Sequence, residues 1–266
     1  MLSPQTSEQA RDWYQTGVSR IGSESVQIGI THLERAIAVF AETGDRRHVT
    51  YARHYILLGQ VLEERFEEAE ALFPDVMQGY TELGESYGQA LLLCHLADAQ
   101  ARQSRWQRAL SLYNLAAVVA ENDQHKEVVL HALWQQGHLC RQRDNLTQAV
   151  KLFQRAERLL EKDEPRHRQA QFRFRRAQAL SVLGETAEAI ALLEDVQTHL
   201  VSLHQSQAAM EPLGLLRQLY EDEGLEKERA RISQLMQLTG QRMIQADMLP
   251  RPVEHLGPAI DRELSA

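Results

Sequence analysis

Histidines are the side chains in this sequence most able to do chemistry, and two of the 11 share one face of a predicted helix. His131 and His138 are seven residues apart, and Trp134 lies between them on the same face. Seven residues span two helical turns, a rise of about 10.5 Å. That distance is too long for both imidazoles to bind one ion without a third element between them. The spacing therefore predicts no metal site and makes these side chains candidates for contacts with a partner.

Motifs for catalysis do not occur in the sequence. It contains no phosphate-binding glycine loop, no HExxH helix, no nucleophile elbow and no Cys/His cluster with metal-ligand spacing. The two cysteines, Cys94 and Cys140, form no CxxC pair, so we expect neither a disulfide framework nor a zinc cage, and a reducing cytoplasm fits best. We therefore expect a non-catalytic protein without a cofactor. An enzyme or a phosphatase-like regulator is the alternative.

Composition sets the class of the protein. Of 266 residues, 43% are hydrophobic and 6% aromatic, and the chain is rich in residues that favour helix, so we expect an all-α protein. A net charge of −8 argues against general nucleic-acid binding, which depends on cationic contacts to phosphates. The first residues lack the features of a signal peptide, and no apolar run has the length of a membrane span. We expect a soluble, cytoplasmic protein that does not insert into membranes.

Charge is unevenly distributed along the chain. Between Val61 and Ser86, eight acidic residues accompany one arginine, whereas between Arg141 and Arg176 eleven Lys and Arg accompany five Asp and Glu. Solvated helix faces with favourable pairing four residues apart explain such runs. The alternative is a basic patch that orients an acidic partner or meets the acidic region of a second copy, which makes a homo-oligomer possible.

Small residues recur every 40 residues and predict the architecture. One column consists of Gly29, Ala69, Ala109, Ala149 and Ala189. A second lies seven residues later: Ala36, Val76, Ala116, Ala156 and Val196. A third lies twelve residues before the first: Gly17, Leu57, Ala97, Gly137 and Ala177. A unit of this length cannot bury its apolar face alone, so stacked units share a continuous core, as in a solenoid.

Each unit contains two amphipathic helices separated by a short polar turn, such as Arg143-Asp144-Asn145. Trp13 and Gly17 in a first helix, and Ala149, Phe153 and Ala156 in a second, resemble the signature of the tetratricopeptide repeat (TPR). The usual TPR has 34 residues, and the 40-residue unit resembles the long repeats of kinesin light chains and peptide-sensing bacterial regulators. The resemblance implies a right-handed α-solenoid of helical hairpins, with five clear repeats and a degenerate sixth hairpin as a cap.

Two features depart from this pattern. Pro74 falls inside the second helix of the second repeat, where its missing N–H should kink or interrupt the helix. Arg173 and Arg176 occupy positions that are apolar in the third repeat. Either the first helix of the fifth repeat is rotated, or these arginines extend along the hairpin to reach solvent.

The TPR resemblance also implies a binding surface, because the first helices of such repeats line a concave groove. Residues at matching positions there include aromatic rings, which bury area at low entropic cost, and polar tips that fix register. The predicted partner-binding residues are Arg11, Tyr14, Tyr51, His54, His131, Trp134, His138, Arg141, Phe174 and Gln178. The alternative for Trp134 and Phe174 is packing between helices. The carboxylate clamp of TPR co-chaperones is not matched at Tyr14, Val18 or His131.

The chain divides into a short N-terminal extension (1–6), the solenoid (7–240) and a tail (241–266) that contains Pro250, Pro252 and Pro258. The tail is either disordered or an intramolecular ligand of the groove. The function we expect is that of a protein or peptide interaction module, acting as an adaptor, assembly factor or regulator. The alternatives are a sensor of a signal peptide or small molecule and a self-associating scaffold.

Overall fold

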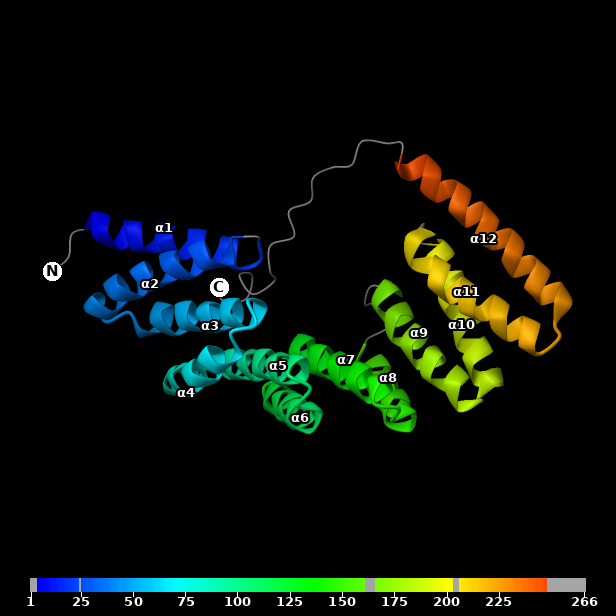
Figure 1. The fold of residues 1–266 in the computed structure, drawn as a ribbon, viewed down its shortest axis with the longest axis horizontal. Helices are drawn as coiled ribbons and strands as arrows, with labels where there is room; N and C mark the ends of the chain where they lie inside the picture. The colour runs from blue at the N-terminus through cyan, green and yellow to red at the C-terminus, as the bar shows by residue number, and fades with distance from the viewer. Residues whose placement is uncertain (1–3, 24, 161–165, 203–205, 248–266) are drawn as a thin grey trace. The chain divides into compact units, whose positions relative to one another are not determined.

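Helices make up the structure. The computed structural model describes residues 4–23, 25–160, 166–202 and 206–247, in which there are twelve helices and no strands. From α1 to α6, and again from α8 to α12, each helix packs against the next one along the chain (Figure 1). They are α1 (Pro4–Ile21), α2 (Val26–Thr43), α3 (Arg46–Leu62), α4 (Phe66–Leu83), α5 (Ser86–Arg102), α6 (Trp106–Asn122), α7 (Lys126–Gln142), α8 (Leu146–Leu159), α9 (Arg166–Leu183), α10 (Thr186–Ser202), α11 (Ser206–Asp222) and α12 (Glu226–Asp247).

The helices follow one another as hairpins, which confirms the all-α repeat architecture. They form two compact units that meet within α7. The N-terminal unit ends at Val129 and contains α1 to α6, and the C-terminal unit begins at Leu130 and contains most of α7 and α8 to α12. In the C-terminal unit, α9 to α12 share one hydrophobic core. Helices α11 and α12 form the sixth hairpin, where the sequence predicts a cap.

The columns of small residues mark the closest helix contacts, as the repeat predicts. Ala69, Ala109, Ala149 and Ala189 are all fully buried. A Cβ atom added to Gly17 would lie 2.6 Å from Cγ of Leu33, and one added to Gly137 would lie 2.4 Å from Cε1 of Phe153. Larger side chains at these positions would overlap the paired helix, so the 40-residue register is confirmed.

A residue with left-handed backbone ends each of eight helices. After Gly44, the amide of Asp45 donates to the carbonyl of Phe40 at 2.8 Å, which satisfies an orphan carbonyl at the helix end. The eight positions are spaced by multiples of 20 residues: Gly44, Glu64, Gly84, Ser104, Gln124, Asp144, Gly184 and Gly224. Half of the repeat is thus one helix plus one turn, which keeps equivalent helix faces in step along each unit.

Pro74 does not interrupt its helix. Helix α4 continues from Phe66 to Leu83 through the proline, so the predicted interruption is wrong. Pro74 lies on the exposed side of α4, whereas Ala69 and Val76 are completely buried on the side that faces the core. One missing backbone hydrogen bond costs less than releasing that buried face would.

Two helix ends extend beyond the predicted boundaries of the solenoid. Helix α1 begins at Pro4, and α12 runs past Gly240 to Asp247. The proline-containing segment from Met248 to Ala266, for which the sequence leaves a disordered tail and an intramolecular ligand open, lies outside the described residues.

The arginines of α9 are held by carboxylates of the neighbouring helices. Arg173 pairs with Asp195 of α10, and Arg176 pairs with Glu188 of α10 and, at 3.2 Å, with Glu157 of α8. The side chains of Arg176 and Glu157 are only 12% and 14% exposed, and burial raises the pKa of Glu157 despite the guanidinium beside it. Ion pairs therefore stand where the third repeat has Leu93 and Leu96, and the pair between Arg176 and Glu157 is buried.

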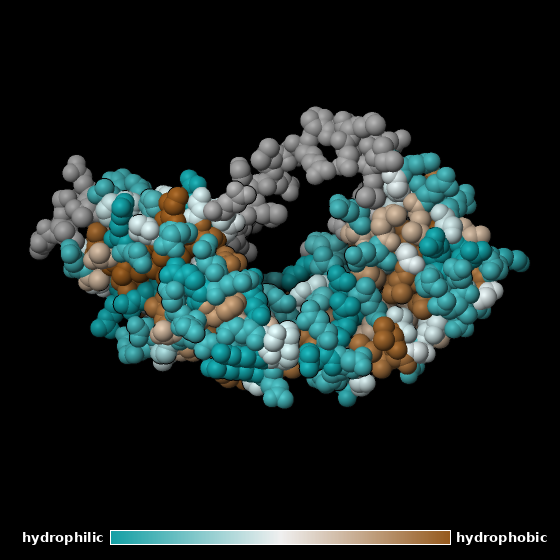
Figure 2. Space-filling view, in the orientation of Figure 1, coloured by the Kyte–Doolittle hydropathy of each residue, from teal (hydrophilic) through white to brown (hydrophobic). Residues whose placement is uncertain are grey.

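Hydrophilic residues dominate the face seen in Figure 2, and hydrophobic residues are confined to small patches.

Part of the predicted acidic region is neutralised within the N-terminal unit, because Glu82 pairs with Arg46 at 3.0 Å and Glu70 with Arg105 at 2.8 Å. Among the described helices, none combines the length and the hydropathy needed to cross a bilayer.

Candidate interaction surface

The aromatic side chains predicted for the groove of the N-terminal unit are bound internally. The hydroxyl of Tyr51 donates to Glu85, 2.7 Å from Oε2, and Glu85 also pairs with Arg47 at 3.0 Å. Burial, and then the hydrogen bond to Glu85, raise the pKa of Tyr51, which keeps the hydroxyl protonated. Tyr14 packs edge-on against His48 and Tyr55, with ring centroids 5.7 and 6.2 Å away. Arg11 lies on α1, as Tyr14 does, and its side chain is exposed.

His54 is the centre of a buried polar chain in the same unit. Its Nδ1 atom lies 2.7 Å from the hydroxyl of Tyr80, and its Nε2 atom lies 2.9 Å from Nδ1 of His95. Burial, and then the charge of His95 when that ring is protonated, hold the pKa of His54 well below its ordinary value. His54 is therefore neutral, and both of its nitrogens are satisfied by the protein itself.

Trp134 organises the corresponding surface of the C-terminal unit. It is half-buried on α7, and its ring lies 4.6 Å from that of His138, one turn further along the same helix. Phe172 of α9 meets it at a right angle with centroids 5.2 Å apart, and Phe153 of α8 lies 6.2 Å away. Trp134 therefore packs against two other helices while part of the residue stays exposed to solvent.

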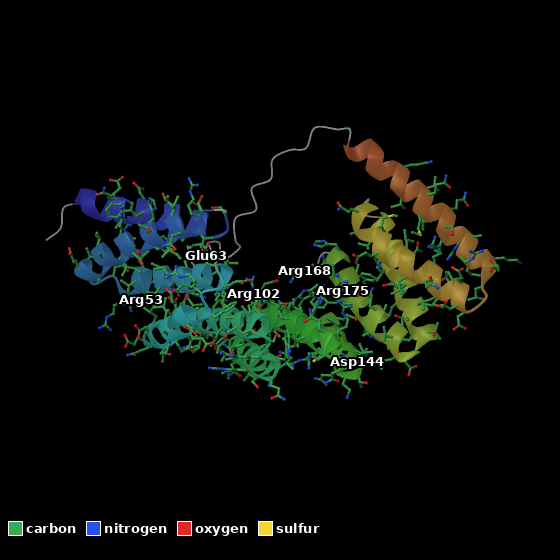
Figure 3. The ribbon with its side chains drawn as sticks, viewed as in Figure 1. Arg53, Glu63, Arg102, Asp144, Arg168 and Arg175 are labelled. Atoms are coloured by element: carbon green, nitrogen blue, oxygen red, sulfur yellow. The ribbon has the colours of Figure 1, made fainter. Side chains whose placement is uncertain are left out.

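Arg175 of α9 completes this cluster. Its guanidinium carbon lies 5.9 Å from the centre of the Trp134 ring and 5.1 Å from that of Phe174, distances typical of cation–π contacts. Nη1 donates to Oε1 of Gln178 at 2.9 Å. The carboxylate that pairs with Arg175, Glu211 of α11, is 3.8 Å away on a side chain that is 72% exposed. Figure 3 labels Arg175 where it projects from α9.

Two nitrogens beside Trp134 have no hydrogen-bond partner among the described residues. They are Nε2 of His138 and Nε of Arg141, and both atoms are buried. Burial, followed by the charges of Arg175 and Arg141, lowers the pKa of His138 to about 4. Burial and Arg141 likewise lower the pKa of Arg175. At neutral pH this surface thus presents two guanidinium groups and a neutral imidazole.

We call these residues the α7–α9 face. It consists of Trp134, His138 and Arg141 from α7 and Arg175 and Gln178 from α9. Such a face can hold a polar group through the two arginines while Trp134 covers neighbouring carbon atoms. In the described parts of the chain, no three His, Cys, Asp or Glu side chains are arranged to hold a metal ion.

No family model and no curated protein matches the sequence. Solved structures nevertheless have a similar fold. BtubC from P. vanneervenii aligns over 98% of this chain and 100% of its own, with a TM-score of 0.67 and 13% identity. A Pyrococcus horikoshii signal transduction ATPase with a tetratricopeptide repeat sensor aligns with a TM-score of 0.70 and 12% identity over 91% of this chain, which corresponds to 38% of that protein. The fold is that of a TPR protein.

A third similar structure is a Rap protein in complex with Competence and Sporulation Factor. It aligns with a TM-score of 0.55 and 14% identity, over 85% of this chain and 67% of its own. In all three comparisons the identity is too low to show more than the TPR fold.

The TPR fold of this chain brings some of the predicted residues together and separates others. Trp134, His138, Arg141 and Gln178 share the α7–α9 face, and His131 is exposed on α7. Phe174 is 7% exposed and belongs to the core of α9 to α12, so its ring is packed between helices. Tyr51 and His54 are buried in the N-terminal unit.

Sequence reasoning missed Arg175 and Glu211. The 40-residue register pairs Trp134 with Phe174, but it is the next residue, Arg175, that lies over the Trp134 ring. The available signal was three arginines within four residues, at 173, 175 and 176. In the structure, Arg173 and Arg176 pair with carboxylates of α8 and α10, whereas Arg175 lies over Trp134. Glu211 comes from the following hairpin, and no periodicity connects it with Arg175.

Proposed function

We propose that this chain is a non-catalytic interaction module that binds a segment of a protein partner on the α7–α9 face. The observation that carries the proposal is a pair of buried nitrogens, His138 Nε2 and Arg141 Nε, which have no hydrogen-bond partner in the described parts of the chain and lie beside the half-buried ring of Trp134. Buried polar atoms normally find partners, and leaving one unsatisfied costs about 1–3 kcal/mol. Both nitrogens are closed off from solvent in the free protein, so a bound segment supplies the missing partners after the two side chains turn toward it, and it covers the indole at the same time.

The N-terminal unit also has two buried side-chain oxygens without a hydrogen-bond partner among the described residues, Oε1 of Gln60 and Oε1 of Gln100. Its aromatic and histidine side chains, however, differ from Trp134 and His138. They use their polar atoms internally, as the contacts of Tyr51 and His54 illustrate. Binding hot spots combine an accessible aromatic or arginine side chain with polar groups that the partner completes. Within each unit taken by itself, the α7–α9 face meets that description better than the Tyr51–His54 region does.

A sensor is the second candidate function. Two of the similar structures favour it by name: one is a tetratricopeptide repeat sensor and another is a complex of a Rap protein with a factor. A sensor would bind a small molecule or a short signal peptide on the same face. Size separates the two functions, because an interaction module retains a protein in affinity purification whereas a sensor retains none and is instead stabilised by a low-molecular-weight extract.

Cross-linking from defined positions tests the interaction module. A photoreactive amino acid replaces His131, which is exposed on α7, and in a matched control it replaces Lys151, which is exposed on α8. In cells that express the full chain, we expect a cross-linked protein from position 131 and none from position 151. Mass spectrometry then identifies the partner.

The His138→Ala substitution, combined with the photoreactive residue at 131, shows whether the face itself is responsible. We expect the cross-link to disappear in this variant and also in His138→Leu, whose melting temperature should stay close to that of the parent because leucine keeps an apolar contact with Trp134 and Phe153. An unchanged cross-link in this variant, or equal cross-linking from positions 131 and 151, would rule out the α7–α9 face as the binding surface.

A further inference from the structure

Charge on the α7–α9 face is unbalanced. Arg141 and Arg175 lie close enough to each other for Arg141 to lower the pKa of Arg175, and both lower the pKa of His138. Opposing them is Glu211, whose carboxylate is 3.8 Å from Arg175 and whose side chain is mostly exposed. An exposed ion pair at this distance contributes little, so the two guanidiniums are only weakly compensated in the free protein.

The fixed geometry of Arg175 makes that charge usable. Trp134 and Phe174 lie 5.9 and 5.1 Å from its guanidinium carbon, and Gln178 accepts from Nη1. Only Nη1 has a hydrogen-bond partner or an ion-pair contact among the described residues. Because the planar, forked guanidinium group of Arg175 is already held in place before binding, a two-point contact with a planar anion has a lower entropy cost.

We infer that the α7–α9 face binds an acidic segment of a partner protein, with a side-chain carboxylate held between Arg175 and Arg141 in the place that Glu211 now approaches. The inference rests on the proposed function and names the chemistry of the partner. Glu211 indicates a carboxylate, because it is the anion that the structure already places beside Arg175. Nε2 of His138 offers a further hydrogen bond once the imidazole turns toward the partner, and Trp134 provides an apolar wall for the carbon atoms next to the carboxylate.

A competition follows from this arrangement. Glu211 occupies part of the site through an exposed side chain, so an incoming carboxylate must displace it. Removing the charge of Glu211 should therefore strengthen binding, whereas removing the charge of Arg175 or Arg141 should weaken it. Opposite signs from two substitutions at one ion pair are difficult to obtain from a general change in stability.

The test uses the full chain and three fluorescently labelled hexapeptides in which leucine alternates with glutamate, glutamine or phosphoserine. At low ionic strength, anisotropy titration should show the glutamate peptide binding about tenfold tighter than the glutamine peptide, the effect expected for a charge-assisted contact. Arg175→Gln and Arg141→Gln should each remove most of this preference. Glu211→Gln should tighten binding of the glutamate peptide severalfold and leave the glutamine peptide unaffected.

Arg217→Gln is the matched control, because Arg217 is an exposed arginine of α11 in the same unit. It removes the same charge from a side chain that is not part of the α7–α9 face. Equal losses in the Arg217 and Arg175 variants would show diffuse attraction and overturn the inference. Arg175→Lys keeps the charge without the planar fork, and we expect it to lose part of the preference. Glu211 is exposed, so Glu211→Gln gives a result even where an arginine variant fails to fold.

The remaining outcomes separate this inference from the proposed function. Equal affinity for the glutamate and glutamine peptides, lost together in Trp134→Ala, would overturn the acidic preference and leave the interaction module standing. A phosphoserine peptide that binds more tightly than the glutamate peptide would overturn the assignment to a carboxylate. Binding of none of the peptides would also overturn the inference, and cross-linking from position 131 decides the proposed function independently.

Discussion

Gly137 offers the sharpest test of how the repeats pack. A Cβ atom at this position would lie 2.4 Å from Cε1 and 2.6 Å from Cζ of Phe153. Phe153 cannot move aside easily, because it is completely buried and its ring also meets Trp134 and His138 at 6.2 and 5.9 Å. We therefore expect Gly137→Ala to force α7 and α8 apart.

Two opposing contributions set the change in the free energy of unfolding that Gly137→Ala causes. Overpacking of a well-packed core costs about 1–3 kcal/mol. Replacing glycine by alanine within a helix contributes about 1 kcal/mol in the other direction. Gly214 isolates the second term, because it lies within α11 of the same unit and a Cβ there would have no atom within 4 Å. We expect Gly214→Ala to stabilise the chain by about 1 kcal/mol and Gly137→Ala to destabilise it, so that the difference between them is the packing term alone.

Urea denaturation followed by far-ultraviolet circular dichroism measures both variants under identical conditions. The unfolding midpoint should fall for Gly137→Ala and rise for Gly214→Ala, with the same dependence on urea. If the two variants were equally stabilised, α7 and α8 would not make the close contact that Gly137 provides, and the 40-residue register would be misassigned at the fourth repeat.

Two further predictions concern protonation and turns. Folding lowers the pKa of His138 from 6.5 to about 4, so the unfolded chain binds the proton more readily than the folded one. The free energy of unfolding should therefore fall as the pH drops from about 6.5 to about 4. Urea midpoints measured across that range should decline less in His138→Leu than in the parent, and an equal decline would contradict the lowered pKa. At Gly84 (φ 69°) nothing lies within 4 Å of an added Cβ, so Gly84→Ala should destabilise the chain by about 1–2 kcal/mol through backbone strain alone. Gln124 has a φ of 61°, so Gln124→Gly should remove the same strain and stabilise the chain. Melting temperatures that move in the same direction for both variants would refute this account.

The repeat architecture was predictable because close packing restricts residue type at fixed positions. Ala149 and Gly137 lie where two helices approach so closely that a larger side chain overlaps the neighbour, and that restriction recurs every 40 residues. The turns were predictable for a similar reason, since polar or glycine residues mark the left-handed positions. The fold was therefore predictable from local restrictions on residue type that repeat along the chain.

The α7–α9 face was predictable only in part. Position along α7 places Trp134, His138 and Arg141 near one another, because residues of one helix keep their spacing whatever packs against them. The side chain that α9 presents to Trp134 depends on how α9 is rotated, and contacts of Arg173 and Arg176 with α8 and α10 help to fix that rotation. Periodicity contains no information about such contacts, so Arg175 and Glu211 were found only in the structure.

Two neutral histidines explain why we propose a binding surface on the C-terminal unit. Both nitrogens of His54 have partners, Tyr80 and His95, whereas Nε2 of His138 is buried without one among the described residues. His54→Leu would leave the Tyr80 hydroxyl unsatisfied and should destabilise the chain by about 1–3 kcal/mol.

The same substitution at His138 should have the opposite effect on the free protein. His138→Leu removes the unsatisfied nitrogen and keeps an apolar contact with Trp134 and Phe153, so the free chain should be as stable as the parent or more stable. Affinity for the partner should nevertheless fall, because the hydrogen bond that binding completes is lost. Melting temperature and peptide anisotropy on the two leucine variants decide the matter. A His138→Leu protein that unfolds as readily as His54→Leu would mean that His138 is a structural residue, and the cost attributed to its unpartnered nitrogen would then have no connection with binding.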